Sequence, residues 1–240
     1  MKLSIIIPVF NEEKTVIHVL QCVIAQSLGK IAKEIIVIDD GSKDKTAQKI
    51  EDFLQKVKPK ELQFIKHANN QGKGAAIKTG IDTATGDYIV IQDADLEYDP
   101  KFLPELLKPI LSGKADIVYG TRLNRLPNFK KEEKNFQFFM HYMGNRFLSL
   151  ITSILYLTWI TDMETCYKIF PRAVTQHISL HAKGFAFEPE ITAKLLKLGL
   201  RVVELPIETK PRGYSEGKKL VALKEGPLAV WTLLKYRFLD

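Results

Sequence analysis

Two runs of consecutive apolar, largely β-branched residues constrain the fold of this chain most. They are LSIIIPV (residues 3–9) and EIIVIDD (residues 34–40). Strands that are apolar on both faces are typical of a parallel sheet covered by helices on both sides. Further strands are predicted at 63–65, 88–91 and 117–119, and amphipathic helical segments lie near 12–27, 44–57, 74–83 and 101–112. This alternation predicts an α/β fold with a mostly parallel central sheet and helices on both faces.

The second half of the chain is less regular. The segment FLSLITSILYLTWI (147–160) holds fourteen uncharged residues, too few to span a bilayer, and is expected to form a buried or interfacial helix. Strands are predicted at 166–170 and 202–207, and a helix at 188–199. The basic, glycine-containing stretch after residue 209 is predicted to be a loop. We therefore expect one domain over residues 1–240.

Charge is distributed unevenly along the chain. Residues 1–120 contain 16 basic and 17 acidic residues, whereas residues 121–240 contain 19 basic and 11 acidic residues. A basic half favours a polyanionic partner, which can be a nucleic acid, an anionic membrane surface or a phosphate-bearing ligand. The aromatic residues do not alternate with Lys and Arg as they do in single-strand binders, which argues against nucleic acid.

Acidic residues mark the ends of two predicted strands. Asp93 and Asp95 follow one of them, and in an extended backbone they would point to the same side, with Glu97 continuing the row. Converging carboxylates repel one another unless a cation lies between them. A hard divalent ion such as Mg²⁺ or Mn²⁺ takes oxygen ligands of this kind and can bridge a diphosphate. We therefore predict a metal site at Asp93, Asp95 and Glu97, against the alternative of an acidic helix-capping turn.

Asp39 and Asp40 end the other acidic strand. One interpretation is that a carboxylate here accepts hydrogen bonds from the N–H groups of uracil or guanine. The other is that Asp40-Gly41-Ser42 closes the strand and caps a helix. Both roles are compatible, with one Asp for each.

Five motifs in the first half resemble one enzyme family: PVFNEE (8–13), VIDDGSKDKT (37–46), NQGKGAAIKTG (70–80), QDADLEYDP (92–100) and GTR (120–122). They look like the inverting family-2 glycosyltransferases, which have a single Rossmann-like nucleotide-diphospho-sugar transferase (GT-A) domain. TDMETCYKIF (161–170), FEPEITAKLLK (187–197) and RGYSEGKK (212–219) resemble the branch that glycosylates polyprenyl phosphates, typified by dolichol-phosphate mannose synthase. The resemblance implies that residues 1–120 bind the nucleotide sugar and that residues 121–240 face the acceptor and the lipid.

The resemblance also implies a set of donor-binding residues: Pro8, Phe10, Glu12, Ile38, Asp40, Asp93, Ala94, Asp95, Arg122, Arg212 and Lys218. Within it, Ile38 and Asp40 would flank the base, and Asp93 and Asp95 would meet the diphosphate and the metal. Phe10 stands where the family often has Tyr, and Glu97 where it often has Gln.

The predicted reaction is metal-dependent transfer of a sugar from a donor of the GDP-mannose or UDP-glucose type to a polyprenyl or dolichyl phosphate. An anionic phosphate acceptor needs no general base, and Arg122, Arg125 and Arg146 are candidates to hold it. The alternative acceptor is a sugar hydroxyl in cell-surface polysaccharide assembly.

A hydroxyl acceptor requires a carboxylate base, for which the candidates are Asp162, Glu188 and Glu190. We select Asp95, Arg122 and Asp162 as the predicted catalytic residues, since Asp162 lies between an apolar helix and a strand.

Three further expectations concern location and the GKG segment. The chain has no apolar stretch of about 18 residues and begins without a cleavable signal pattern, so we expect a cytoplasmic protein. The resemblance implies peripheral binding at the cytosolic membrane face and is compatible with an integral-membrane partner protein. GKG (72–74) lacks P-loop spacing and is expected to form a tight turn before a helix, with Lys73 near the nucleotide.

Overall fold

The structure, a computed structural model, describes residues 1–123, 136–184, 186–210 and 222–239, and only the backbone of residues 136–138 and 222–224. Its strands are β1 (Lys2–Val9), β2 (Ala32–Asp39), β3 (Leu62–Lys66), β4 (Tyr88–Ile91), β5 (Ile117–Thr121), β6 (Lys168–Pro171) and β7 (Val202–Pro206). Its α-helices are α1 (Val16–Ala25), α2 (Thr46–Val57), α3 (Lys73–Thr83), α4 (Leu103–Leu111), α5 (Phe136–Tyr156), α6 (Phe187–Lys197) and α7 (Ala222–Phe238). Two 3-10 helices, η1 (Pro100–Phe102) and η3 (Arg172–Gln176), complete the described elements.

The strands form one seven-stranded sheet in the order β3-β2-β1-β4-β6-β5-β7. Only β6 runs antiparallel to its neighbours β4 and β5, while the remaining pairs are parallel. The predicted mostly parallel α/β sheet is therefore confirmed. The strand order reverses beside β1, the type of position where α/β sheets bind ligands beyond the carboxyl ends of their strands.

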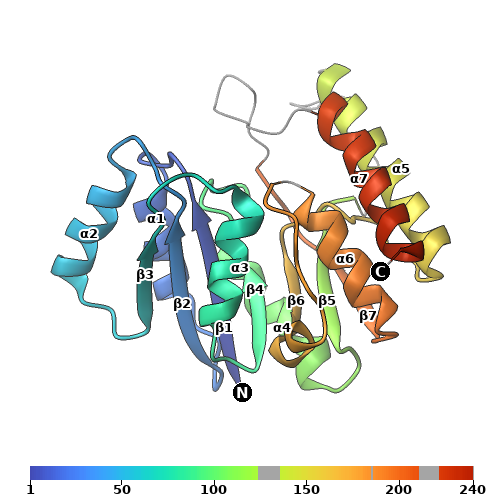
Figure 1. Cartoon of the computed structure of the whole chain (residues 1–240). Helices are drawn as coiled ribbons and strands as arrows, with labels where there is room; N and C mark the ends of the chain where they lie inside the picture. Colours follow the sequence, from blue (N-terminus) through green and yellow to red (C-terminus); the bar gives the residue numbers. More distant parts are fainter. Residues whose placement is uncertain (124–135, 185, 211–221, 240) are drawn as a thin grey trace.

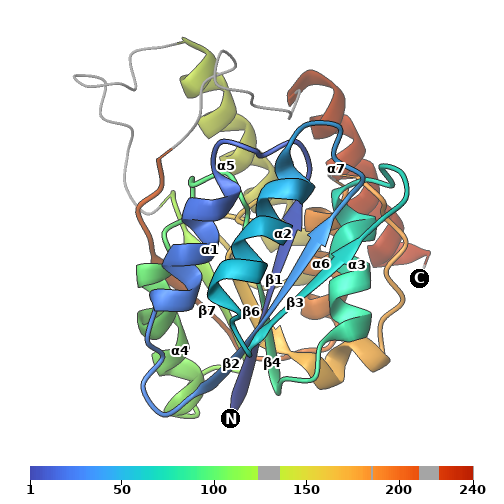
Figure 2. The same cartoon turned by 90° about the vertical axis from the view of Figure 1, so that its left-hand side faces the viewer.

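Helices cover both faces of the sheet, as predicted. In Figure 2, α1 and α4 lie on one side of the sheet and α3 and α6 on the other. The central strands are consequently buried on both faces, and the side chains of Ile5, Ile6 and Ile7 are all completely buried. This burial explains the unbroken apolar runs of the sequence, because no face of β1 or β2 meets solvent along its centre.

The predicted elements in the first half agree with the structure to within a few residues at each end. The difference lies in the second half. The helix expected at 147–160 is α5, which begins earlier and ends at Tyr156, where Leu157 takes a left-handed backbone conformation with φ of 55°. Helix α7 was not predicted at all, since it contains Gly226 and Pro227, two residues that normally interrupt helices.

Helices α5 and α7 pack side by side and lie outside α6, away from the sheet (Figure 1). The hydroxyl of Tyr156 on α5 donates a hydrogen bond of 2.8 Å to the carbonyl of Leu233 on α7. The ammonium of Lys194 on α6 lies 4.1 Å above the ring of Tyr236 on α7. Within the described residues, no helix combines the length and the apolar character needed to cross a membrane.

Candidate active site

A pocket of about 570 Å³ opens at the carboxyl ends of β1 and β4. It is lined by residues of both halves of the chain, from the β1 end and the β4–η1 segment on one side to α5, α6 and α7 on the other. Nine of the predicted donor or metal residues line it: Pro8, Phe10, Glu12, Asp40, Asp93, Ala94, Asp95, Glu97 and Arg122. The pocket therefore gathers residues that are far apart in the sequence.

Asp40 is part of the pocket wall, where it organises the neighbouring loop. Its two carboxylate oxygens accept hydrogen bonds from the ring of His67 (2.8 Å) and from the backbone N–H groups of Gln71 (2.9 Å) and Gly72 (2.7 Å). Ile38, the other residue predicted beside the base, is completely buried in the core and does not line the pocket. Its side chain packs against Gly80 of α3 in the core.

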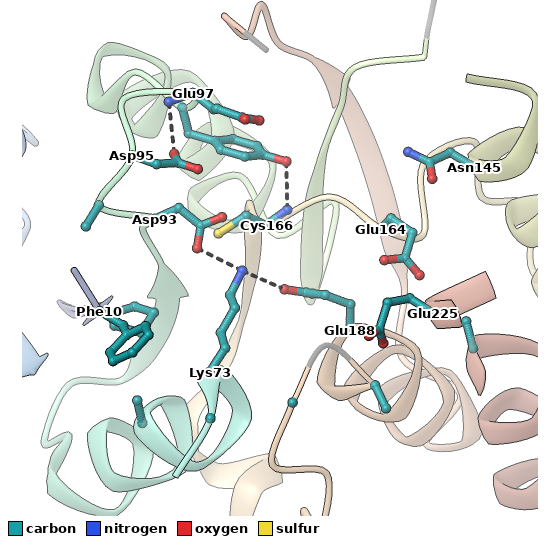
Figure 3. Close-up of a pocket in the computed structure, with 18 of the residues that line it drawn as sticks. Phe10, Lys73, Asp93, Asp95, Glu97, Asn145, Glu164, Cys166, Glu188 and Glu225 are labelled. Atoms are coloured by element: carbon teal, nitrogen blue, oxygen red, sulfur yellow. Dashed lines mark hydrogen bonds and ion pairs between the residues drawn. The ribbon is translucent and has the colours of Figure 1, made fainter. Parts of the chain in front are cut away.

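Asp93 has a cationic partner within the protein. The ammonium of Lys73 lies 2.8 Å from Oδ1 of Asp93 and 3.6 Å from Oε1 of Glu188 (Figure 3). Burial opposes charge on both groups, but their mutual attraction outweighs it. The pKa of Asp93 is therefore lowered, and that of Lys73, which also feels Glu188, is raised well above its ordinary value. Lys73 and Asp93 are both charged near neutral pH.

The backbone that carries the three predicted carboxylates, Asp93, Asp95 and Glu97, is not extended. Strand β4 ends at Ile91, and Leu96 takes a left-handed conformation with φ of 65°. The backbone N–H of Glu97 donates a 3.0 Å hydrogen bond to Oδ1 of Asp95, which closes a turn. Figure 3 shows Asp95 and Glu97 on this turn, joined by that hydrogen bond. Accordingly, the described part of the chain contains no cluster of three or more acidic, His or Cys side chains arranged to hold a metal.

Two carboxylates nevertheless suit a hard cation that is completed by a ligand. Mg²⁺ is usually held by one or two carboxylates together with substrate phosphates and water, not by a cage made only of protein groups. Asp93 and Asp95 both border the open pocket. Their oxygens fit such a partial site, and the turn at Leu96 interrupts the extended row that was predicted to include Glu97.

The GKG segment forms the turn expected from the sequence and brings Lys73 to the pocket. Gly72 has φ of 101°, a conformation that favours glycine. The N–H of Gly74 donates a 2.8 Å hydrogen bond to the carbonyl of Lys183. A side chain on Gly72 or Gly74 would overlap the backbone carbonyls of residues 182–183. The start of α3 and the segment leading into α6 are therefore in direct contact, which places Lys73 beside Glu188.

Arg122 and Asp162 form a tight ion pair at one side of the pocket. Asp162 accepts three hydrogen bonds from Arg122: from the backbone N–H (2.9 Å), from Nε (2.7 Å) and from Nη2 (2.7 Å). Burial would lower the pKa of Arg122, but the charge of Asp162 raises it well above the ordinary value. Asp162 is completely buried and does not line the pocket. Its predicted use as a base is therefore not supported, since both of its oxygens are occupied in orienting Arg122.

The other two base candidates differ from each other. Glu190 is completely buried and accepts hydrogen bonds from the backbone N–H groups of His181 and Ala182, so it ties the segment before α6 to that helix. Glu188 lines the pocket. Its Oε2 contacts the buried ammonium of Lys168 at 2.5 Å, while its Oε1 has no hydrogen-bond partner within the described residues.

Glu164 is a pocket residue that the sequence reasoning did not select. Burial, together with the negative charge of Glu188, raises the pKa of Glu164 to about 7. It lies in the TDMETC segment, two residues after Asp162, so the motif marked the right place but the wrong carboxylate as the one facing the pocket. Figure 3 shows Glu164, Glu188 and Glu225 on the same side of the pocket, opposite Phe10.

The acceptor candidate Arg146 does not lie in the pocket wall. Its Nη1 on α5 donates a 3.3 Å hydrogen bond to the carbonyl of Leu123. The acceptor candidate Arg125 and the donor candidates Arg212 and Lys218 lie outside the described residues. Helix α5 contributes Met140, His141 and Asn145 to the lining. No sequence signal identified these three, because a helix packs against the pocket only in the folded chain.

Comparison with known proteins agrees with this geometry. The sequence matches the family Glycosyl transferase family 2 over residues 4–178. An uncharacterized protein of Methanocaldococcus jannaschii is 31% identical over 98% of this chain and 99% of its own length. The dolichyl-phosphate beta-glucosyltransferase of Dictyostelium discoideum is 28% identical over 85% of this chain, which spans 65% of that protein.

Among solved structures, glucosyl-3-phosphoglycerate synthase from Mycobacterium tuberculosis, in complex with Mn²⁺, uridine diphosphate and phosphoglyceric acid, superposes with a TM-score of 0.70. It covers 100% of this chain and 79% of its own, at 20% identity, and shows that the fold is that of the GT-A glycosyltransferases. With its parallel sheet, its pocket at the strand ends and its sequence match, the chain is a glycosyltransferase that belongs to glycosyl transferase family 2.

Proposed function

We propose that this enzyme transfers a hexose, with inversion, from a nucleoside diphosphate sugar to a polyprenyl phosphate at a membrane surface. The observation that carries the proposal is the shape of the site. A pocket whose inner wall holds Asp93, Asp95 and Lys73 continues to Met140, an exposed residue of the apolar outer surface of α5. A polar donor and an acceptor with an apolar tail can therefore meet in one site. The first half of the chain provides the donor side, and the second half provides the acceptor side.

The donor side accounts for the diphosphate. Asp93 and Asp95 would hold Mg²⁺ or Mn²⁺ together with the diphosphate oxygens. Bound there, such an ion supplies Lewis-acid stabilisation of the charge that develops on the leaving nucleoside diphosphate. The guanidinium of Arg122, fixed in the pocket wall by Asp162, adds a positive group that needs no reorganisation during the reaction. Mn²⁺ also accompanies uridine diphosphate in the Mycobacterium tuberculosis enzyme of similar fold.

The acceptor side has features that suit a lipid phosphate. Helices α5 and α7 each carry a stripe of exposed apolar residues at helical spacing: Met140, Met143, Phe147, Leu150 and Ile154 on α5, and Leu228, Trp231, Leu234 and Phe238 on α7. We call these two stripes the apolar face. An amphipathic helix of this kind can lie in the headgroup region of a bilayer. The dolichyl-phosphate enzyme of Dictyostelium supports a phosphate acceptor carried by a lipid.

Exposed Lys235 and Arg237 on α7 provide positive charge next to the apolar face. Each basic residue near an anionic leaflet contributes about 1 kcal/mol of attraction. Peripheral binding at the cytosolic face would bring the lipid phosphate to the pocket without any membrane-spanning helix of this chain.

Transfer to a sugar hydroxyl is the second candidate. One observation favours it: Glu188 lines the pocket and its Oε1 accepts no hydrogen bond within the described residues, so it is available as a general base for a hydroxyl acceptor. A phosphate acceptor is already anionic and needs no such group.

The test combines donor and acceptor. Purified enzyme is first screened with GDP- and UDP-hexoses, with Mn²⁺, with Mg²⁺ and with EDTA, for a rise in the thermal midpoint, because a bound donor stabilises the folded state. The donor that binds is then incubated with a polyprenyl phosphate or with an oligosaccharide in detergent. The proposal expects a metal-dependent glycolipid product. It fails if no nucleotide sugar is bound, and the second candidate replaces it if only the oligosaccharide is glycosylated.

A separate variant tests the assignment of the metal site. Asp95→Asn should retain the fold but lose the stabilisation that Mn²⁺ adds in the presence of the donor, while Glu105→Gln, an exposed carboxylate change on α4, should keep it. Retention of metal-dependent turnover in Asp95→Asn would reject the assignment.

A further inference from the structure

Glu188 is the one buried side chain of the described residues with an acidic oxygen that lacks a hydrogen-bond partner. The residue lines the pocket, and its side chain is 6% exposed. A buried carboxylate oxygen without a hydrogen bond costs free energy, so such a group is usually completed by a ligand or by water. The feature points to a ligand hydroxyl or N–H that approaches Oε1 from the pocket.

Both neighbours of Glu188 fix its orientation. On one side Oε2 contacts Lys168, which is completely buried in β6 and also donates to the carbonyl of Thr165. On the other side Lys73 lies 3.6 Å from Oε1, beyond hydrogen-bonding distance. The carboxylate is therefore held between two ammonium groups. A carboxylate oxygen accepts hydrogen bonds, so a ligand group that pairs with it is a donor.

The position of Glu188 relative to Asp93 indicates which part of a bound donor would lie beside Glu188. The single ammonium of Lys73 contacts Asp93 at 2.8 Å and Glu188 at 3.6 Å, so the two carboxylates lie within about the width of one hexose ring. The diphosphate of a donor bound at Asp93 and Asp95 would carry its hexose on the adjoining side. A hexose has several hydroxyl donors, and epimers differ only in where one of them points.

We propose that Glu188 is a specificity-determining residue whose Oε1 accepts a hydrogen bond from a hydroxyl of the hexose being transferred. This inference rests on the proposed function, because it requires a nucleotide sugar in the pocket. A site that offers a buried hydrogen-bonding group rejects analogues that leave it unpaired, which is the physical basis for discrimination between epimers. Lys168 and Lys73 act as positioning residues, since they orient the carboxylate.

The role differs from that of a general base in what it predicts. A residue that accepts a hydrogen bond from the hexose affects the binding of the nucleotide sugar. It does not affect the binding of the nucleoside diphosphate alone, which has no hexose. A general base affects turnover and leaves both binding steps unchanged. A purely structural residue lowers stability and weakens both ligands together.

The experiment measures, by calorimetry with Mn²⁺, the affinity of wild type and Glu188→Gln for the nucleoside diphosphate and for its glucose, galactose and mannose derivatives. We expect Glu188→Gln to bind the diphosphate within about two-fold of wild type and the preferred nucleotide hexose about 10- to 100-fold more weakly, as for a lost bond to a charged group. The preference among epimers should fall with it. Glu105→Gln, which changes an exposed carboxylate on α4 outside the pocket, should leave both quantities unchanged.

Two results would overturn the inference: an unchanged ratio of hexose-derivative to diphosphate affinity in Glu188→Gln, or an equal change in Glu105→Gln. Since Glu188→Gln leaves the ammonium of Lys168 with a neutral partner, the thermal midpoint is measured first. The double variant Lys168→Met, Glu188→Gln removes both charges and gives the same test if the single variant does not fold. If wild type binds no nucleotide sugar, the proposed function fails instead, and the two failures are distinguishable.

Discussion

At the scale of single residues, the Arg122–Asp162 pair shows how a buried carboxylate can serve a site without facing it. Asp162 fixes both the backbone and the guanidinium of Arg122, and Arg122 borders the pocket. Removing one partner of a buried pair leaves the other charge without compensation. The pair therefore links the stability of the β5 end to the geometry of the pocket.

We expect Asp162→Asn to lower the free energy of unfolding by about 3 kcal/mol, because Arg122 would keep its charge but lose its ionic partner. Urea denaturation measures this loss. Arg122→Lys, which keeps the charge but not the two-pronged geometry, should reduce turnover with less effect on stability. If Asp162→Asn unfolds at the same urea concentration as wild type, the pair does not stabilise the β5 end.

The raised pKa of Glu164 predicts that the stability of the protein depends on pH. This pKa is about 7 in the folded protein, above the ordinary value of 4.5, so the folded state holds a proton that the unfolded state has released. Stability therefore falls as pH rises between about 4.5 and 7. Glu164→Gln should raise the thermal midpoint relative to wild type at pH 8 and change it little at pH 4.5.

Asp116 serves as the control of opposite sign. Its hydrogen bonds with Arg201 lower the pKa of Asp116 to about 2, so its contribution is present above about pH 4 and is lost only in stronger acid. Asp116→Asn should lower the midpoint at pH 8. A gain for Glu164→Gln that is the same at pH 4.5 and pH 8 would contradict the raised pKa.

At the scale of elements, the contact between the start of α3 and the segment before α6 joins the two halves of the pocket. Gly74 approaches the backbone of Ala182 and Lys183 so closely that a methyl group would overlap it. This contact explains the GKG pattern without a phosphate-binding P-loop.

Gly74→Ala should therefore destabilise the protein by about 1–3 kcal/mol, the usual cost of forcing extra volume into a packed contact. Gly144→Ala is the matched control, since an added Cβ on α5 meets no atom within 4 Å. There the greater helix propensity of Ala should leave stability equal or higher. Equal denaturation midpoints for the two variants would contradict a tight contact at Gly74.

At the scale of the whole molecule, helices α5 and α7 carry the apolar face and also border the pocket. Met140 belongs to both. A contiguous exposed apolar patch is typical of an interaction surface. Docking through the apolar face would place the pocket mouth next to the lipid.

We expect wild type to float with vesicles containing anionic lipid, and less so at high salt, which screens Lys235 and Arg237. The double variant Phe147→Glu, Trp231→Glu should bind such vesicles at least about ten-fold more weakly, because it places charges in the apolar face. Val57→Glu, an equally exposed apolar position on α2, is the control and should bind like wild type. Equal flotation of all three proteins would reject this face as the docking surface.

The α/β class, the mostly parallel sheet and the acidic end of β4 can be predicted from sequence, because strand burial and helix periodicity depend on the local spacing of apolar residues. Which carboxylates face the pocket depends on the folded chain, since Asp162, Glu164 and Glu188 are alike in sequence and differ in their neighbours. The folded structure also contains α7, a helix that the sequence pattern did not predict because Gly226 and Pro227 lie within it. Lys73 could be placed near the nucleotide from its turn, but its contact with Glu188 depends on two helices that only folding brings together.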